Sequence, residues 1–169
     1  MEDKLTKLKS ESFYFQTIRL ATKLKVSFLV KVPNVKLLLM TANYFKRVEG
    51  RKQFQKAVFL LQEQFEIEFT YPFIPYLYGP YSSQLQNDID NLARTGYLKA
   101  SKNGPLYFYE ITKLGEMFAL QAEKEYGEKQ SQELKKKVDN LKDFETDELV
   151  NWSKKLMKDK YKSNFVFPW

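Results

Sequence analysis

The stretch Thr95-Gly-Tyr-Leu-Lys-Ala-Ser-Lys-Asn-Gly-Pro-Leu-Tyr-Phe-Tyr-Glu-Ile-Thr-Lys-Leu-Gly115 decides the fold. Asn103-Gly104 lies between two runs rich in β-formers, and it predicts a tight hairpin because both residues tolerate a positive φ. Gly96 is typical of the position just past a helix end, and Thr112 is typical of a helix N-cap. A helix, a two-stranded ribbon and another helix in this order are the second half of a winged helix.

Upstream of this stretch, the apolar spacing predicts two helices and an extended segment. Asn34 is a suitable N-cap for a helix over residues 34–48, and Gly50 breaks the pattern. A second helix over residues 51–64 gathers its apolar side chains on one face. The segment 67–78 is rich in aromatics and carries two prolines. We expect it to be irregular extended chain that contributes an edge strand.

The helix that feeds the ribbon begins after a sharp turn at residues 78–83, Tyr-Gly-Pro-Tyr-Ser-Ser. Ser83 and Gln86 have the spacing of a capping box, so we expect the helix to begin at Ser83 and to end at about Thr95. Its buried face would consist of three apolar residues at helical spacing: Leu85, Ile89 and Leu92.

Three further helices are predicted after the ribbon. The first covers residues 113–126 and runs through Leu114, Met117, Phe118 and Gln121; two more follow over about 131–142 and 146–160. The tail at 164–169 is unusually apolar for a chain end. Leu149, Trp152 and Leu156 with the tail 165–169 are best explained by oligomerisation or by docking onto the core. Dimerisation through the helices that flank the wing is the role that we prefer for residues 113–160.

The N-terminal 33 residues form a basic arm whose local structure the sequence leaves open. Alternating apolar residues over 24–32 favour a strand, a similar alternation near Phe13 allows a hairpin, and other spacings suit a helix. Residues 1–36 carry eight Lys and Arg against three acids, so most of the net charge of +7 lies here. A basic chain of this kind favours a polyanionic partner.

Composition excludes several kinds of chemistry. The chain has no Cys and no His, which removes disulfides, thiol nucleophiles, most transition-metal sites and the commonest general base. We therefore expect no enzyme activity, no cofactor and no metal. No signal-peptide pattern or membrane-spanning run is present, which favours a cytoplasmic protein without a membrane partner. The Cys-free, Lys/Glu-rich composition is also compatible with a thermophile.

Two motifs carry a resemblance to a known family. The run 50–62, Gly-Arg-Lys-Gln-Phe-Gln-Lys-Ala-Val-Phe-Leu-Leu-Gln, is followed by 76–82, Tyr-Leu-Tyr-Gly-Pro-Tyr-Ser, and by Gly-Tyr-Leu at 96–98. In this order they resemble the YwgA-type winged-helix family and, more distantly, the Panacea antitoxin domain. The resemblance covers about residues 34–120. It implies a winged-helix fold, and it implies either transcriptional regulation or binding to a protein toxin.

The helix preceding the ribbon offers candidate DNA-reading residues. Asn pairs well with adenine and Arg with guanine in the major groove. Two carboxylates, Asp88 and Asp90, leave this helix with a charge of about −1, which opposes binding to phosphate. The candidates for DNA contact are Ser83, Asn87, Asn91 and Arg94 on the helix, Lys102 and Asn103 on the ribbon, and Arg51 and Lys52 at the turn between the first two predicted helices. The competing interpretation is an ordinary solvated polar face with solubilising charge.

The three tyrosines that flank Gly79-Pro80 are candidates for a different role. Tyr76, Tyr78 and Tyr81 can stack on bases, can form a hot spot that binds a protein partner, or can simply pack a turn between helices. A protein-interaction winged helix that does not bind DNA is therefore the alternative to a DNA-binding one.

The sequence as a whole predicts an α+β, mostly helical fold: a winged helix-turn-helix domain at 34–126, an N-terminal basic arm at 1–33, and a C-terminal helical extension with an aromatic tail at 127–169. The function we expect is that of a dimeric transcriptional regulator that binds double-stranded DNA.

Overall fold

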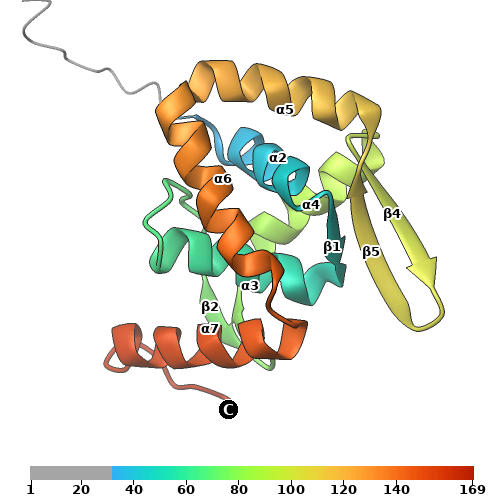
Figure 1. The fold of residues 1–169 in the computed structure, drawn as a ribbon. Helices are drawn as coiled ribbons and strands as arrows, with labels where there is room; N and C mark the ends of the chain where they lie inside the picture. Colours follow the sequence, from blue (N-terminus) through green and yellow to red (C-terminus); the bar gives the residue numbers. More distant parts are fainter. Residues whose placement is uncertain (1–31) are drawn as a thin grey trace, which may run out of the picture. The chain divides into compact units, whose positions relative to one another are not determined.

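Six helices and five short strands follow one another over residues 32–169, the part of the chain that the computed structural model describes (Figure 1). The predicted α+β, mostly helical class is confirmed, since 60% of these residues are helical. The predicted arm at 1–33 lies outside the described residues except for Val32 and Pro33. In chain order the elements are α2 (Asn34–Phe45), β1 (Arg47–Glu49), α3 (Gly50–Glu63), β2 (Ile74–Tyr76), β3 (Gly79–Tyr81), α4 (Ser83–Arg94), β4 (Leu98–Asn103), β5 (Leu106–Ile111), α5 (Lys113–Tyr126), α6 (Glu128–Lys142) and α7 (Thr146–Tyr161).

The predicted ribbon is an antiparallel hairpin of β4 and β5 that projects away from the helices (Figure 1). Its turn differs from the prediction by one residue, because Asn103 stays in the strand opposite Leu106. The central residues are Gly104, with φ of +60°, and Pro105. A hairpin turn with positive φ at its first central residue suits Gly followed by Pro, since proline fixes a negative φ.

A third strand that the sequence pattern did not indicate completes this sheet. The helix predicted over 34–48 ends at Phe45, and Arg47–Glu49 forms β1 against β5, which gives the strand order β1-β5-β4. Lys46 makes the transition with φ of +65°. Val48 is buried opposite Tyr109 in this strand pair, so its apolar side chain fits a strand as well as a helix face.

The predicted edge strand before α4 is one half of a second hairpin. β2 and β3 pair antiparallel, with Pro75 opposite Pro80. Residues 79–81, which the sequence suggested were only a turn into the helix, form strand β3. Two three-residue strands are too short for local patterning to detect, and Pro75 and Pro80 can sit in them because the sheet has only two strands.

Helix α4 is anchored at both ends. Its N-cap is Ser82 and not Ser83, because the Ser82 hydroxyl accepts a hydrogen bond from the amide of Leu85 at 3.3 Å. At the other end the amide of Gly96 bonds to Ala93 O and the amide of Tyr97 bonds to Leu92 O, which is a Schellman arrangement with Gly96 at φ of +82°. The predicted inward face is confirmed: Leu85, Ile89 and Leu92 are all buried.

Helix α5 begins at the predicted N-cap Thr112, but it packs through small residues instead of large ones. Gly115, Ala119 and Ala122 are its buried residues, and the helix packs on α2. A Cβ on Gly115 would lie only 2.2 Å from the carbonyl oxygen of Tyr97, so the close approach itself requires glycine. The residues through which we expected this helix to run, Leu114, Met117, Phe118 and Gln121, are exposed.

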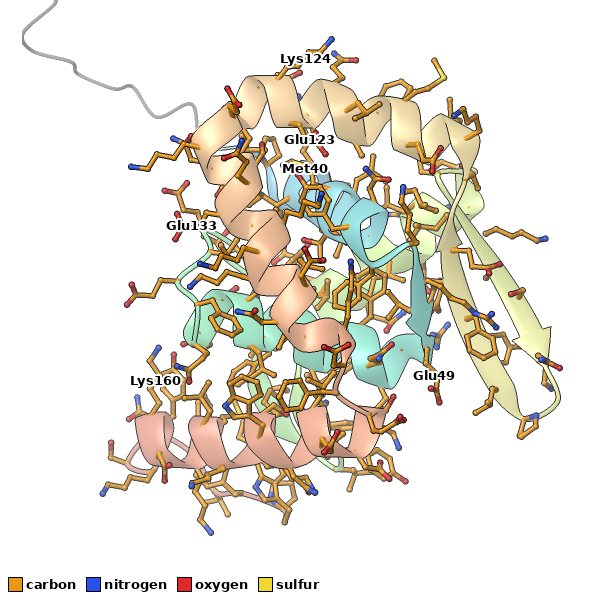
Figure 2. The ribbon with its side chains drawn as sticks, viewed as in Figure 1. Met40, Glu49, Glu123, Lys124, Glu133 and Lys160 are labelled. Carbon is orange, nitrogen blue, oxygen red and sulfur yellow. The ribbon has the colours of Figure 1, made fainter. Side chains whose placement is uncertain are left out.

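The last two helices belong to the same unit as the rest of the described chain. Helix α6 packs on α2, and α7 packs on α3 and β3, so the predicted extension covers the core, in which Met40 is fully buried (Figure 2). Lys160 of α7 donates hydrogen bonds to the carbonyl and the carboxylate of Glu63 on α3 (Figure 2). Over residues 32–169, none of the helices has the length and apolar character needed to cross a bilayer.

Replacing Gly115 with Ala tests the close packing of α5. In an ordinary helix this change stabilises by about 0.5–1 kcal/mol. Here we expect a loss of about 1–3 kcal/mol in the free energy of unfolding, because the new methyl group would press on the backbone of Tyr97. Urea denaturation measures the difference, with Gln121→Ala on the exposed face of the same helix as the control. A stabilised Gly115→Ala variant would contradict the packing described above.

Candidate functional site

The outer face of α4 carries the predicted reading residues in an accessible row. Asn87, Asn91 and Arg94 are all exposed and follow one another at i, i+4 and i+7, so they lie on one side of the helix. Arg94 donates a hydrogen bond to the side chain of Asn91 at 2.6 Å, which orients both groups together. Ser83 is also exposed, one turn before Asn87. No later helix of the described chain covers this row.

The two carboxylates of α4 are held at the edges of this face by the chain itself. Asp90 accepts hydrogen bonds from Gln86 at 3.0 Å and from Arg51 at 3.4 Å. Asp88 accepts a hydrogen bond from the hydroxyl of Tyr71 at 2.8 Å. The negative charge of Asp88 and Asp90, which opposes binding to DNA, is therefore partly compensated by residues of the fold itself.

The β4–β5 hairpin places the predicted contact residues Lys102 and Asn103 at an exposed tip. Lys102 lies over the ring of Tyr107 with its Nζ 5.8 Å from the ring centroid, which is a cation–π arrangement. Lys99 adds a second exposed cation on the same strand. Only three residues join α4 to this hairpin, so the C-terminal end of α4 lies beside the base of β4.

Arg51 and Lys52 begin α3, but they do not stand free as simple phosphate contacts. Arg51 bonds to the hydroxyl of Tyr109 at 3.3 Å and pairs with Asp90. The Tyr109 hydroxyl is the main cause of the raised pKa of Arg51. Lys52 sits over the ring of Tyr78 at 4.8 Å. Arg51 therefore ties α3 to both α4 and β5, while Lys52 points toward the β2–β3 hairpin.

The two motifs behind the family resemblance contact each other directly. The Gln55 side-chain amide donates to Ser82 O at 2.9 Å and accepts from Ser82 N at 2.9 Å. The next residue, Lys56, donates to Pro80 O at 2.7 Å. Both Gln55 and Ser82 are almost wholly buried. We call these three hydrogen bonds the Gln55–Lys56 clamp; because Ser82 caps α4, the clamp fixes where that helix starts on α3.

The three tyrosines divide between packing and exposure. Tyr81 is half-buried and its ring lies 5.4 Å from that of Tyr76. Tyr76 and Tyr78 themselves are exposed, as are Ile74 and Leu77 of the same hairpin. The interpretation that the tyrosines simply pack a turn therefore fits Tyr81 better than the other two.

A hollow of about 210 Å³ lies between α3, the β2–β3 hairpin and α4. It is lined by all three tyrosines, by Gln86 and by the basic residues of α3. Burial, and after it the charges of Lys154 and Lys52, lowers the pKa of Lys56 in this hollow to about 7. The sequence alone does not single out Lys56, because its burial comes from β3 and α7, which local patterning does not reveal.

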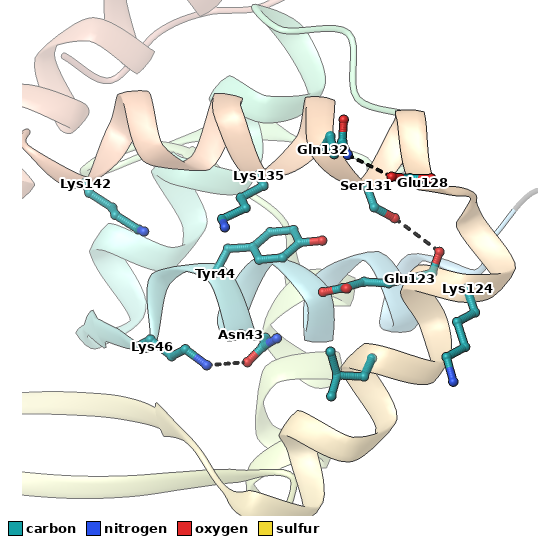
Figure 3. Close-up of a pocket in the computed structure, with 11 residues that line it drawn as sticks. Asn43, Tyr44, Lys46, Glu123, Lys124, Glu128, Ser131, Gln132, Lys135 and Lys142 are labelled. Carbon is teal, nitrogen blue, oxygen red and sulfur yellow. Dashed lines mark hydrogen bonds between the residues drawn. The ribbon is translucent and has the colours of Figure 1, made fainter.

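A larger hollow of about 820 Å³ lies between α2, α5 and α6 (Figure 3). None of the predicted site residues lines it. Burial and the neighbouring Glu123 carboxylate raise the pKa of Tyr44, whose ring lies among the lining side chains. Several polar side chains that line this hollow form hydrogen bonds with one another, such as Lys46 with Asn43 and Gln132 with Glu128 (Figure 3). The hollow is open and carries both signs of charge, which defines no particular ligand.

No group of three acidic side chains converges as a metal site within residues 32–169. Comparisons of the chain with protein-family models, with curated proteins and with solved structures give no match. The family resemblance therefore stays a prediction from the two motifs, whose mutual contact through the Gln55–Lys56 clamp is a separate structural observation.

The low pKa of Lys56 predicts a pH-dependent stability. Lys56 holds its proton more weakly in the folded state than in the unfolded state, so unfolding takes up a proton between about pH 7 and pH 10 and stability rises across this window. Above about pH 7, we expect the free energy of unfolding of wild type to rise by up to about 1.4 kcal/mol per pH unit relative to that of Lys56→Met. Below about pH 7 the difference between the two proteins should stay constant. Urea denaturation at several pH values up to about pH 9 measures this difference.

Lys155→Met, an exposed change one residue from Lys154 on α7, is the control for Lys56→Met. Its stability difference from wild type should not vary across the same pH range. Parallel curves for wild type and Lys56→Met would mean that the Lys56 ammonium is not desolvated in the folded protein.

Proposed function

We propose that this protein is a winged-helix DNA-binding protein that acts as a dimeric transcriptional regulator, with α4 in the major groove and the β4–β5 hairpin on the adjoining backbone. The observation that carries the proposal is the exposed row of Asn87, Asn91 and Arg94 beside a protruding hairpin that bears Lys99 and Lys102. In this proposal the α4 row reads bases while the hairpin lysines bind the phosphates of the same duplex.

The topology supports this proposal. Helix α2, strand β1, helices α3 and α4, and the β4–β5 hairpin follow the order of a winged helix, and the sheet order β1-β5-β4 agrees with it. One feature departs from a simple helix-turn-helix. The segment 64–82 between α3 and α4 contains the β2–β3 hairpin, where a short turn is usual. The Gln55–Lys56 clamp supplies the connection that a short turn would otherwise provide.

The electrostatics support a modest affinity for DNA that depends only weakly on salt. Arg51 is already paired with Asp90, so we now expect it to position α4 more than to bind phosphate. The exposed Lys99 and Lys102 of β4 are better placed to neutralise phosphates than Lys52, which lies over the ring of Tyr78. Few phosphate contacts imply a shallow dependence of affinity on salt.

Within residues 113–160, we place the proposed dimer contact on the outer face of α5. The apolar faces of α6 and α7 are occupied by the chain's own core, with Leu149 buried and Trp152 packed against Phe65. By contrast, α5 exposes apolar side chains at 42–61% of their surface, and it begins directly after the hairpin. A two-fold contact here would present two α4 helices to paired half-sites. These exposed residues are Leu114, Met117, Phe118 and Leu120.

A protein-interaction role is the second candidate, and one observation favours it. The β2–β3 hairpin exposes Ile74, Tyr76, Leu77 and Tyr78 at 51–60% of their surface. Exposed clusters of aromatic and aliphatic side chains are typical of surfaces that bind a protein partner. An antitoxin-like or adaptor module would use this hairpin, with the polar face of α4 beside it, and would not require DNA.

Two alanine variants test DNA binding. Arg94→Ala should weaken binding to a selected duplex by about 1–3 kcal/mol and relax the preference at one base pair. Lys102→Ala should weaken binding to all duplexes similarly and reduce the slope of log affinity against log salt by about one. The target duplex is first selected from a random pool at low salt, and affinities are then measured by fluorescence anisotropy.

Lys129→Ala is the matched control for Lys102→Ala. It removes one exposed lysine from the start of α6, which lies across the molecule from the hairpin (Figure 1). Sedimentation of the complex should show two chains on each duplex. If no duplex is retained at low salt, or if Lys129→Ala and Lys102→Ala have the same effect, the surface of α4 and the hairpin does not bind DNA, and the protein-interaction role takes its place.

A further inference from the structure

The small hollow between α3, the β2–β3 hairpin and α4 is built around unneutralised positive charge. Three of its lining residues are cationic, and none is a carboxylate. Arg51 is paired with Asp90 at the rim. Lys52 and Lys56 have no carboxylate within ion-pair distance among residues 32–169. Their positive charges are therefore available to an anion in the hollow.

The buried ammonium group of Lys56 has spare hydrogen-bonding capacity. The residue is only 3% exposed, and among the described residues its one hydrogen-bond acceptor is Pro80 O. An ammonium group has three N–H donors, so two of them lack a protein acceptor. Gly79 makes room for this side chain, since a Cβ there would lie 3.3 Å from Lys56 Cε. Burying a charge without a counter-ion is costly, and an anion in the hollow would remove that cost.

A second polar group in the same hollow also lacks a partner. Gln86 is only 7% exposed, and its Oε1 makes no hydrogen bond within the described chain. Its Nε2 donates to Asp90 at 3.0 Å, which holds the amide in place and leaves the oxygen as a free acceptor. An unsatisfied acceptor and unsatisfied donors that line one hollow indicate a ligand that supplies both counterparts.

We propose that this hollow binds a small molecule that joins an anionic oxygen group, a carboxylate or a phosphate monoester, to a flat ring. The anion would bind Lys56 and Lys52, the ring would lie against the tyrosines of the β2–β3 hairpin, and a hydroxyl or amide group of the ligand would donate to Gln86. The volume of about 210 Å³ accommodates a ring of the size of benzene with its head group. The proposal is independent of DNA binding, because none of these residues lies in the Asn87, Asn91, Arg94 row.

The affinity for such an anion depends on pH in a defined direction. The charged and titratable groups around Lys56 come from each element at the hollow. Lys154 on α7 and Lys52 on α3 act on it directly, Arg51 and the three tyrosines share its lining, and Asp90 on α4 pairs with Arg51 at the rim. Without ligand the pKa of Lys56 is about 7. A bound anion favours the charged form, so binding takes up a proton and weakens as the pH rises above about 7.

The test uses two matched probes, benzoate and phenyl phosphate, which carry different anions on the same ring. Benzyl alcohol serves as the neutral control and inorganic sulfate as the anion without a ring. Titration of the full chain is followed by the ¹⁵N–¹H resonances of Gly79, Ser82 and the Gln86 side-chain amide. We expect benzoate, phenyl phosphate or both to shift these resonances with saturation at millimolar concentrations, and benzyl alcohol to bind at least tenfold more weakly. The tighter of the two anionic probes identifies the head group.

Variants and pH provide two separate checks. Lys56→Met should lower the affinity for the tighter-binding anionic probe by tenfold or more. Lys155→Met on the exposed face of α7 should leave that affinity unchanged. For unaltered protein, benzoate affinity should fall about tenfold between about pH 6 and about pH 8, a result that does not depend on whether Lys56→Met folds normally. Equal binding of benzyl alcohol, an absence of saturable shifts with both anions, or a pH-independent benzoate affinity would overturn the proposal.

Discussion

The paired hydrogen bonds between the Gln55 amide and the backbone of Ser82 are the interaction on which the rest of the structure depends. A side-chain amide that donates to a carbonyl and accepts from the N–H of the same residue imitates a strand partner, and here it does so in a buried place. Ser82 is the N-cap of α4, so its position determines where that helix begins. An amide with this role must lie inside the fold, because water would compete for both bonds.

The same clamp explains why the chain can insert a hairpin between α3 and α4. The β2–β3 hairpin is a two-stranded unit of three residues a side, which is too small to be stable alone. It is held by Lys56 at Pro80 from α3 and by the packing of α7 on β3. The arrangement separates two surfaces: the row of Asn87, Asn91 and Arg94 on one side of α4, and the basic hollow beside its first turn. A ligand in that hollow would touch the element that positions the row.

Local sequence signals predicted the elements well wherever the determining contacts are local. The apolar spacing of Leu85, Ile89 and Leu92, the glycine after α4 and the Thr112 cap all depend on residues within one or two helical turns, and all are confirmed. The features that were missed depend on distant partners. Strand β1 exists because residues 47–49 meet β5 some sixty positions later, and no pattern of three residues can show that.

The candidate site divides in the same way. The exposed row on α4 followed from helical periodicity alone. The burial of Lys56, by contrast, requires β3 and α7 to be in place. The inward face of α5 was predicted wrongly because the helix backbone approaches Tyr97 at Gly115, and the buried face that follows carries small residues, among them Ala119. A prediction from hydrophobicity places the large apolar side chains on the buried face of a helix. Where two backbones approach closely, the buried face must instead carry small side chains.

Hydrogen exchange on a Gln55→Ala variant tests the central claim most directly, with Gln64→Ala at the exposed end of α3 as the control. Loss of the Gln55 amide leaves the buried N–H of Ser82 without a partner, while the Ser82 carbonyl still accepts from the amide of Gln86 at 3.1 Å. We therefore expect a loss of about 1–3 kcal/mol in the free energy of unfolding. Protection should fall first at the amides of Ser82 and Leu85, ahead of the amides in the middle of α2. If Gln55→Ala matched Gln64→Ala in stability and left the protection of Ser82 and Leu85 unchanged, the clamp would not be what holds α4 in place.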